Sequence, residues 1–162
     1  MERIHSFPPI VDENCRVLVL GTMPGRESLR QQRYYAFGPN ALWRIIFALY
    51  GLPCPEDYDQ RVAFLLEKHI ALWDVLHSCE RQGTSADADI RAPQANDFVW
   101  LFETYPRIQH VFFNGNGAAR LFHRHVLPVL SHCPPMSMLP STSPAYAKSF
   151  EFKLEGWKPL IQ

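Results

Sequence analysis

A short apolar run that stops at a glycine constrains the fold more than any other feature of this sequence. Arg16–Gly21 reads RVLVLG, with no polar residue between its two ends. Strands of a parallel sheet that is covered on both faces show such continuous apolar runs, whereas half-exposed strands alternate polar and apolar residues. We therefore expect a buried parallel strand here, followed by a loop that begins at the glycine.

Similar apolar runs alternate with helical patterns along the rest of the chain. This alternation predicts an α/β fold, a three-layer α/β/α sandwich with a central four-stranded parallel sheet. A chain of 162 residues has the length of one domain, so we expect residues 1–162 to form a single one. The other strands are expected at residues 69–76, 109–114 and 136–139, the helices at 41–51, 57–69, 94–106, 115–131 and in the C-terminal tail, and a polar, turn-rich segment at 78–93.

The composition restricts the possible partners and cofactors. Sixteen basic and sixteen acidic residues give a formal net charge of zero, which argues against a protein that coats nucleic acid through bulk electrostatics but permits a local basic patch. The four cysteines lack CxxC spacing and the seven histidines lack HxxxH or HExxH spacing, so we expect no metal and no cofactor. The absence of a long apolar run or an N-terminal leader predicts a cytoplasmic protein without a membrane partner.

Polar or glycine-rich segments follow all four predicted strands. In open parallel sheets, ligands bind beyond the carboxyl ends of the strands. Because these ends meet at one edge, we expect the four segments to lie together and to form the functional site. They are GTMPG at 21–25, WDV at 73–75, FNG at 113–115 and LPSTSPA at 139–145.

The first of these segments and the loop after it each allow two interpretations. GTMPG lacks the GxxxxGK[ST] and GxGxxG patterns, which argues against nucleotide triphosphate and dinucleotide sites. Its backbone N–H groups could contact a ligand closely, or it could be a simple tight turn. Arg26, Arg30 and Arg33 lie beside two tyrosines, a pattern that suits phosphate binding and base stacking but also a solvated loop.

Two further polar residues and one polar loop also have a structural alternative. Asn40 follows a proline and precedes an apolar helix, so it is either the N-cap of that helix or a residue that orients a water molecule. Asp74 ends a predicted strand and either caps the next loop or accepts a hydrogen bond from a base. Ser141, Thr142 and Ser143 lie between two prolines, where they could bind a phosphate or merely form a turn.

Taken together, three segments resemble motifs of the uracil-DNA glycosylase superfamily. They are VLVLGTMPG at 17–25, YAFGPNALW at 35–43 and LPSTSPA at 139–145, and they most resemble the hypoxanthine-DNA (deoxyinosine) glycosylase branch. The resemblance spans roughly residues 16–150. It implies the same four-stranded fold, and a monofunctional enzyme that flips a deaminated base such as hypoxanthine or uracil out of DNA. Such an enzyme hydrolyses the N-glycosidic bond as the first step of base excision repair, and we expect it to be a nucleoid-associated monomer.

The resemblance also assigns roles to residues near the base. Many relatives place an Asp or Asn in the first motif to direct the attacking water, but this chain has Met23 there. In the hypoxanthine branch this catalytic role falls to the asparagine that matches Asn40. Tyr35 matches the aromatic residue that stacks on the flipped base, and Asp74 aligns roughly with the base-reading residue of classical uracil enzymes. Further contacts to the base are expected from Asn114 and from the backbone N–H groups of Thr22 and Met23.

The resemblance implies a DNA-binding surface as well. The second motif begins with Leu139 instead of His or Asn, and Ser143 occupies the position of the leucine wedge of relatives. These departures favour an enzyme slower on uracil and less restricted to it than the classical ones. Tyr146 is the substitute candidate for the intercalating side chain. The remaining expected DNA contacts are Arg26, Arg30, Arg33, Ser141, Thr142 and Ser143.

Two alternatives stay open at this point. One is a DNA-damage binding module that no longer catalyses and therefore does not depend on Asn40. The other is a nucleoside hydrolase that acts on free inosine or uridine, an alternative that the neutral net charge favours slightly.

Overall fold

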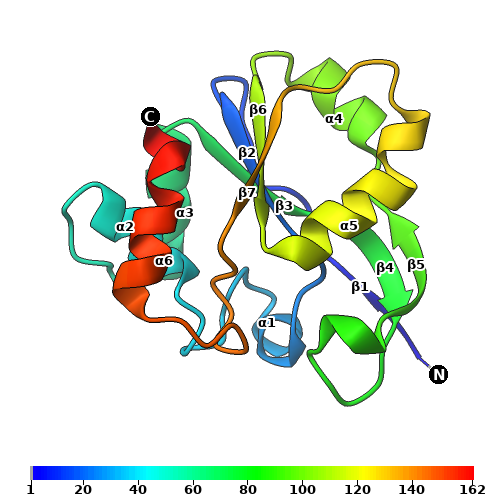
Figure 1. The fold of residues 1–162 in the computed structure, drawn as a ribbon, viewed down its shortest axis with the longest axis horizontal. Coiled ribbons are helices and arrows are strands. Elements are labelled where there is room, and N and C mark those ends of the chain that lie inside the picture. Colours follow the sequence, from blue (N-terminus) through cyan, green and yellow to red (C-terminus); the bar gives the residue numbers. More distant parts are fainter. Residues whose placement is uncertain (1) are drawn as a thin grey trace.

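The computed structural model describes residues 2–162 and contains the expected parallel sheet at its centre (Figure 1). Its four strands lie in the order β3-β2-β6-β7, and every neighbouring pair is parallel. The strands are β2 (Val17–Gly21), β3 (Ile70–Asp74), β6 (His110–Asn114) and β7 (Met136–Leu139).

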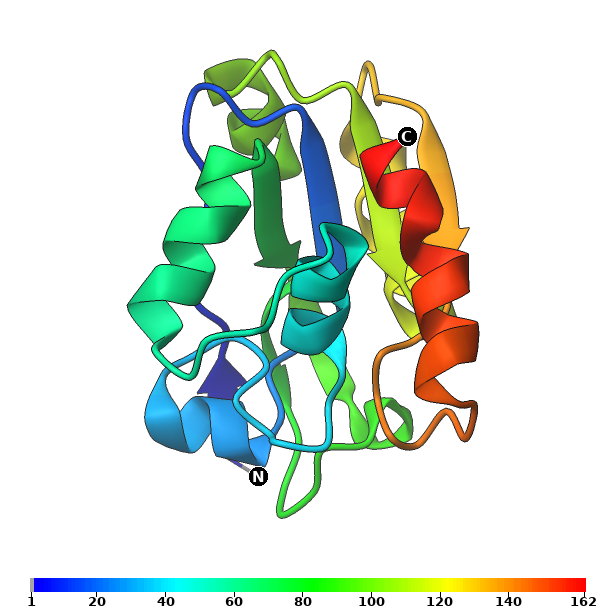
Figure 2. The same cartoon turned by 90° about the vertical axis from the view of Figure 1, so that its left-hand side faces the viewer.

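Helices cover both faces of this sheet, which confirms the three-layer sandwich (Figures 1 and 2). One face carries α2 (Leu42–Leu49), α3 (Tyr58–Glu67) and α6 (Phe150–Trp157), and the other carries α4 (Phe98–Thr104) and α5 (Asn116–His125). Short 3-10 helices, η2 (Leu127–Val129) and η3 (Lys158–Ile161), follow α5 and α6. Within the part of the chain described, no helix is long and apolar enough to span a membrane.

A second, antiparallel sheet with the order β1-β4-β5 was not expected from the sequence. Its strands are β1 (Arg3–His5), β4 (Leu76–Glu80) and β5 (Arg91–Ala95). The segment expected to be a polar turn region at 78–93 is therefore the end of β4, a loop with the 3-10 helix η1 (Asp87–Asp89), and the start of β5. The short β1 and the mostly exposed, polar β5 carry little of the apolar signal by which strands are recognised.

Several local elements also differ from expectation. The strand expected over 69–76 ends at Asp74, with Leu76 already in β4, and the helix expected over 115–131 ends at His125. The loop after β2 contains a short helix, α1 (Arg26–Gln31), where only irregular structure was expected. The helix expected over 94–106 occupies only Phe98–Thr104, because Gln94 and Ala95 belong to β5 and Asp97 caps the helix by accepting from the N–H of Trp100.

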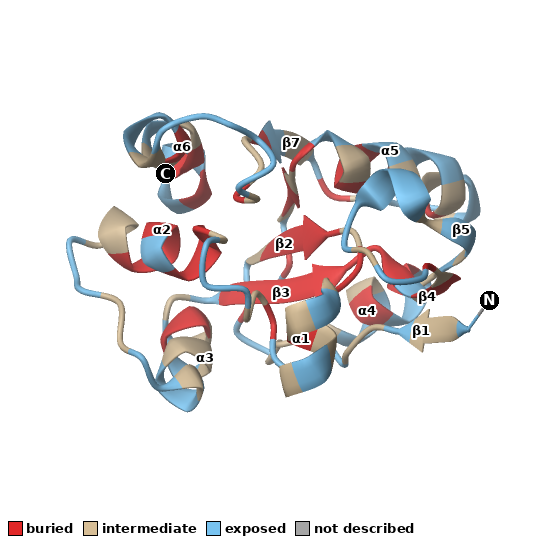
Figure 3. Ribbon diagram, turned by 90° about the horizontal axis from the view of Figure 1, so that it is seen from below, coloured by how far each residue is buried: buried red, intermediate tan, exposed pale blue. Residues whose placement is uncertain are grey.

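The carboxyl ends of the parallel strands meet at one edge, which Figure 3 views from below. Gly21 pairs with Asp74, and Asn114 pairs with Leu139, so the last residues of all four strands lie in adjacent register positions. The two strands β2 and β3 are almost fully buried behind this edge; Leu18, Val19 and Leu20 have no exposed surface. A rigid sheet therefore presents the four expected segments to a common region.

Candidate active site

Two polar side chains lie in close contact with Gly21, the last residue of β2. A Cβ atom built on Gly21 would lie 2.6 Å from the Tyr35 hydroxyl oxygen and 2.7 Å from Oδ1 of Asp74. Only glycine permits this approach. Tyr35 itself has a φ of 53°, the left-handed conformation that non-glycine residues rarely adopt and that often occurs at functional sites. The sheet edge thus brings Tyr35 and Asp74 together, as the sequence predicts.

A buried threonine connects two asparagines of this region. The Thr142 hydroxyl donates to Oδ1 of Asn40 at 2.8 Å and accepts from Nδ2 of Asn114 at 2.9 Å. The Thr142 N–H donates to Oδ1 of Asn114 at 2.9 Å, and its carbonyl accepts from the N–H of Ala41 at 3.0 Å. Nδ2 of Asn114 also donates to the Tyr35 hydroxyl at 3.2 Å. These bonds join the loop after β2, the end of β6 and the loop after β7.

Asn40 lies one residue before the position expected of it. The N-cap of α2 is Ala41, yet Oδ1 of Asn40 still accepts the N–H of Leu42 at 3.0 Å. Nδ2 of Asn40 donates to no group in residues 2–162. This atom is not fully buried, so a ligand can reach it. The capping and water-orienting alternatives are therefore compatible, because they use opposite ends of the amide.

Asp74 is a carboxyl group held in an environment that disfavours its charge. It is 4% exposed, and Oδ2 is buried without a hydrogen-bond partner among the described residues. Burial raises the pKa of Asp74 to about 7, the negative charge of Asp87 adds to this, and Arg81 partly offsets it. Near neutral pH, a substantial fraction of Asp74 is therefore the neutral acid.

The other groups expected to contact a base are also near this edge. Burial, and then the charge of Asp74, raises the pKa of the Tyr35 hydroxyl, so it remains a neutral donor and acceptor. In the chain from residue 2 onward, the N–H groups of Thr22 and Met23 donate no hydrogen bond and remain available. The Thr22 hydroxyl is engaged, because it donates to Oδ1 of Asp87 at 2.7 Å.

Two charged residues near the site, Arg81 and Asp87, were not expected there from the sequence. Arg81 is 4% exposed and donates to the carbonyls of Pro24 and Ser85, while its Nε has no partner within residues 2–162. These hydrogen bonds hold the loop between β4 and β5 against the GTMPG segment. No sequence signal distinguishes this arginine from exposed ones, because its burial depends on the antiparallel sheet that the sequence analysis missed.

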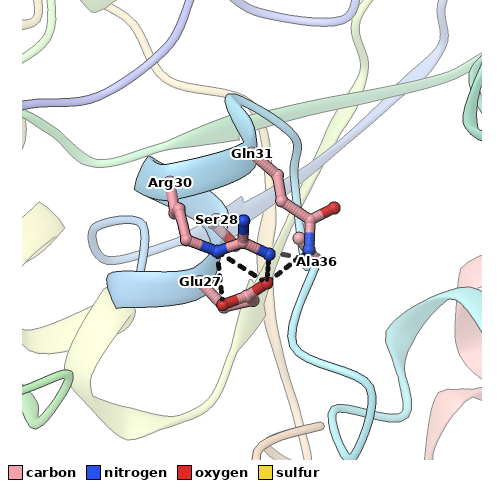
Figure 4. A network of polar contacts seen from close by, with 5 residues as sticks. All are labelled: Glu27, Ser28, Arg30, Gln31 and Ala36. Carbon is pink, nitrogen blue, oxygen red and sulfur yellow. Dashed lines mark hydrogen bonds and ion pairs between the residues drawn. The ribbon is translucent and has the colours of Figure 1, made fainter.

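The three arginines expected to bind DNA are exposed but partly engaged. Arg30 forms an ion pair with Glu27, which also accepts from Gln31 (Figure 4). The hydrogen bond from Arg30, and then that from Gln31, lowers the pKa of Glu27 to about 2. Arg26 donates to the carbonyl of Gly83 at 3.3 Å, and Arg33 lies over the ring of Tyr58. Arg26 and Arg33 thus retain an uncompensated charge in these contacts, whereas Glu27 balances that of Arg30.

The polar residues of the loop after β7 differ in their exposure and in their hydrogen bonds. Thr142 is 1% exposed and its hydroxyl is used inside the protein, so it does not offer that hydroxyl to a phosphate as expected. The Ser141 hydroxyl accepts from the N–H of Ser143, and the Ser143 hydroxyl accepts from the N–H of Ala145. Tyr146 is 38% exposed and lies beside Lys153, whose Nζ donates to the Ser143 carbonyl at 2.9 Å.

This arrangement can hold a polar ligand through donors and one titratable acid. Within residues 2–162, Nδ2 of Asn40 and the N–H groups of Thr22 and Met23 donate to no group, and Asp74 is the buried acid. No group of three or more His, Cys, Asp or Glu side chains among the described residues could hold a metal ion. The geometry suits orientation of a water molecule and of a planar, hydrogen-bonding ligand.

The chain is similar to one protein-family model, to curated sequences and to a solved structure. A family model of the uracil DNA glycosylase superfamily matches residues 8–160. A hypoxanthine DNA glycosylase of Methanosarcina barkeri (strain Fusaro) is 31% identical over 154 residues, with 94% of each chain covered. A hypoxanthine DNA glycosylase of Methanosarcina acetivorans is 31% identical over 159 residues, with 98% of each covered. The solution NMR structure of a Methanosarcina acetivorans protein, described as a candidate uracil DNA glycosylase, is 30% identical and superposes with a TM-score of 0.83 over 99% of this chain and 97% of that one.

Proposed function

This chain belongs to the uracil DNA glycosylase superfamily and is a DNA glycosylase, and we propose that it hydrolyses the N-glycosidic bond of deaminated bases, hypoxanthine and/or uracil, in DNA. The observation that carries the proposal is the Asn40 amide, whose free Nδ2 lies at the same sheet edge as Tyr35 and Asp74. The names of the two similar Methanosarcina proteins support hypoxanthine as a substrate.

In this mechanism Asn40 directs the attacking water. Nδ2 donates a hydrogen bond to the water oxygen and holds it below the sugar. The oxygen attacks C1′, the C1′–N bond breaks, its electron pair leaves with the base, and the water proton passes to solvent. An amide is a weak base, but an oxocarbenium-like transition state needs little proton abstraction. Positioning and electrostatic stabilisation therefore supply most of the rate enhancement.

The base is recognised by other groups at the same edge of the sheet. The ring of Tyr35 stacks on the flipped base, a contact worth about 1–3 kcal/mol. The N–H groups of Thr22 and Met23 donate to a base oxygen, and Asn114 contacts the base or holds Tyr35. Asp74 binds the base edge as the neutral acid, and this form avoids the repulsion that a carboxylate would exert on a departing base anion.

The protein works as a monomer at the first step of base excision repair, on nucleoid DNA in the cytoplasm. Arg26, Arg30 and Arg33 contact phosphates, with Arg30 the weakest because Glu27 neutralises it. Tyr146 enters the space that the flipped nucleotide leaves. The hydroxyls of Ser141 and Ser143 lie on the same loop and contact the DNA backbone.

Replacing Gly21 with alanine is expected to lower the excision rate by about 10-fold or more, because the new Cβ displaces the Tyr35 hydroxyl and Asp74. Single-turnover excision from a hypoxanthine duplex measures the effect. Gly38→Ala is the matched control, since its Cβ would meet no atom within 4 Å. Equal rates for both variants would contradict the assignment of Tyr35 and Asp74 to the site.

A comparison of substrates tests the proposal against its two alternatives. Purified protein is given duplexes with hypoxanthine or uracil, and separately free inosine and uridine, at several salt concentrations. We expect release of base from DNA only, with binding that weakens steeply as salt rises, because phosphate contacts release counterions. Cleavage of free nucleosides without salt dependence would identify a nucleoside hydrolase. Salt-dependent DNA binding without release of any base would identify a binding module.

A further inference from the structure

We infer that Thr142 is a positioning residue for base excision, which holds the Asn40 amide with Nδ2 toward the substrate. The inference rests on the proposed catalytic role of Asn40. The sequence position of Thr142 suggests a phosphate contact, but in this proposal Thr142 positions the catalytic group instead.

Thr142 uses all its polar groups within the protein. Its hydroxyl donates to Asn40 and accepts from Asn114, its N–H donates to Asn114, and its carbonyl accepts from Ala41, at 2.8 to 3.0 Å. The side chain is 1% exposed. A hydroxyl this engaged and this buried has no capacity left for a phosphate, but it determines the conformation of the two asparagines that it joins.

The contacts also fix which end of the Asn40 amide faces the ligand. The N–H of Leu42 can only donate, so the side-chain atom that accepts from it at 3.0 Å is an oxygen. The Thr142 hydroxyl occupies the second lone pair of this oxygen. With both lone pairs in use, Asn40 acts on the water as a donor through Nδ2, not as an acceptor.

Without the Thr142 hydroxyl, a single bond from Leu42 would restrain the amide. The amide could then turn about its side-chain torsions, and the water that it holds would move relative to C1′. A displacement of about 1 Å can reduce a catalysed rate by about 100-fold. The loss should fall on the chemical step, because Thr142 contacts neither the base nor the phosphates.

The experiment compares Thr142→Val with Thr142→Ser in single-turnover excision of hypoxanthine from a duplex, alongside the dissociation constant for the same DNA. Valine keeps the shape and removes the hydroxyl, whereas serine keeps the hydroxyl. We expect Thr142→Val to slow excision by about 10- to 100-fold, with binding changed less than about 3-fold, and Thr142→Ser to restore most of the rate. Thr104→Val makes the same chemical change at an exposed helix end and should excise at the wild-type rate.

A double-variant cycle separates positioning from general support of the fold. In an Asn40→Ala background, followed over hours, adding Thr142→Val should slow excision much less than it slows the wild type, and the remaining effect acts through Asn114. A wild-type rate for Thr142→Val, failure of serine to restore the rate, or an equal penalty in both backgrounds would overturn the inference. If the valine variant does not fold, Thr142→Ala takes its place in the same cycle.

The same experiment reports separately on the proposed function. A wild-type protein that releases no base would overturn the proposed function and this inference together. An Asn40→Ala variant as fast as the wild type would remove the catalytic role of Asn40. A slow Asn40→Ala variant beside a fast Thr142→Val variant would overturn the Thr142 inference alone.

Discussion

Asn40→Ala is expected to lower the excision rate by about 100-fold or more, because the attacking water loses the group that positions it below the sugar. The variant loses Nδ2, which we propose holds the attacking water, and it also loses the bond that Oδ1 makes to Thr142. Because we assign Asn40 to the water and not to the base or the phosphates, binding of a hypoxanthine duplex should change little. Single-turnover rates at saturating enzyme, measured beside the dissociation constant, separate these two effects.

Asn14→Ala is the matched control for this prediction. Asn14 is exposed, lies just before β2 at the amino edge of the sheet, and accepts from Arg107 at 3.0 Å. It should excise at the wild-type rate. If Asn40→Ala also kept the wild-type rate, another group would have to direct the water, and Asp74 would be the next candidate.

Asp74→Asn is expected to make the protein more stable while removing a pH dependence. In the folded protein the pKa of Asp74 is about 7, against 3.8 for the ordinary carboxyl group. Because the folded pKa is the higher one, the folding free energy becomes less favourable as pH rises from about 4 to about 7. The loss of folding stability reaches up to about 4 kcal/mol above about pH 7 and is absent below about pH 4. The variant should therefore melt about 5–10 °C higher than the wild type at pH 7.5, with little difference at pH 4.

The same variant tests the neutral form of Asp74 in excision. If the neutral acid binds the base, the wild-type rate should fall as pH rises through about 7 and the carboxyl group ionises. The Asp74→Asn variant should show no such fall. Asp89→Asn, which changes an exposed carboxylate in η1, should keep both the wild-type melting temperature and the wild-type profile. A pH–rate profile of Asp74→Asn equal to that of the wild type would contradict a role of Asp74 in the reaction. An unchanged melting temperature would contradict the claim that burial disfavours the charge of Asp74.

The sequence predicts the parallel sheet and its edge because both depend on short-range patterns. Val17–Leu20 is apolar throughout, and parallel strands must end on a common side, so the pattern alone places Asp74 and Asn114 near the GTMPG loop. The same reasoning locates the candidate site at that edge. It requires only the order of the strands along the chain, not the packing between them.

Long-range packing explains what the sequence could not predict. Asn40 and Thr142 are 102 residues apart, and nothing in PSTSP distinguishes the buried threonine from the partly exposed serines on either side of it. The burial of Arg81 follows from an antiparallel sheet whose outer strands are short or polar. The charge state of Asp74 depends on these neighbours, so it too becomes visible only in the fold.

The most direct test of the proposed function is release of free hypoxanthine from a duplex that carries one such base. After incubation with the wild-type protein, the sample is divided, and one half is treated with alkali to cleave abasic sites. A monofunctional glycosylase releases free hypoxanthine in both halves and gives a broken strand only in the alkali-treated half. An intact strand after alkali, with no free hypoxanthine or uracil from matched duplexes, would contradict the proposed function.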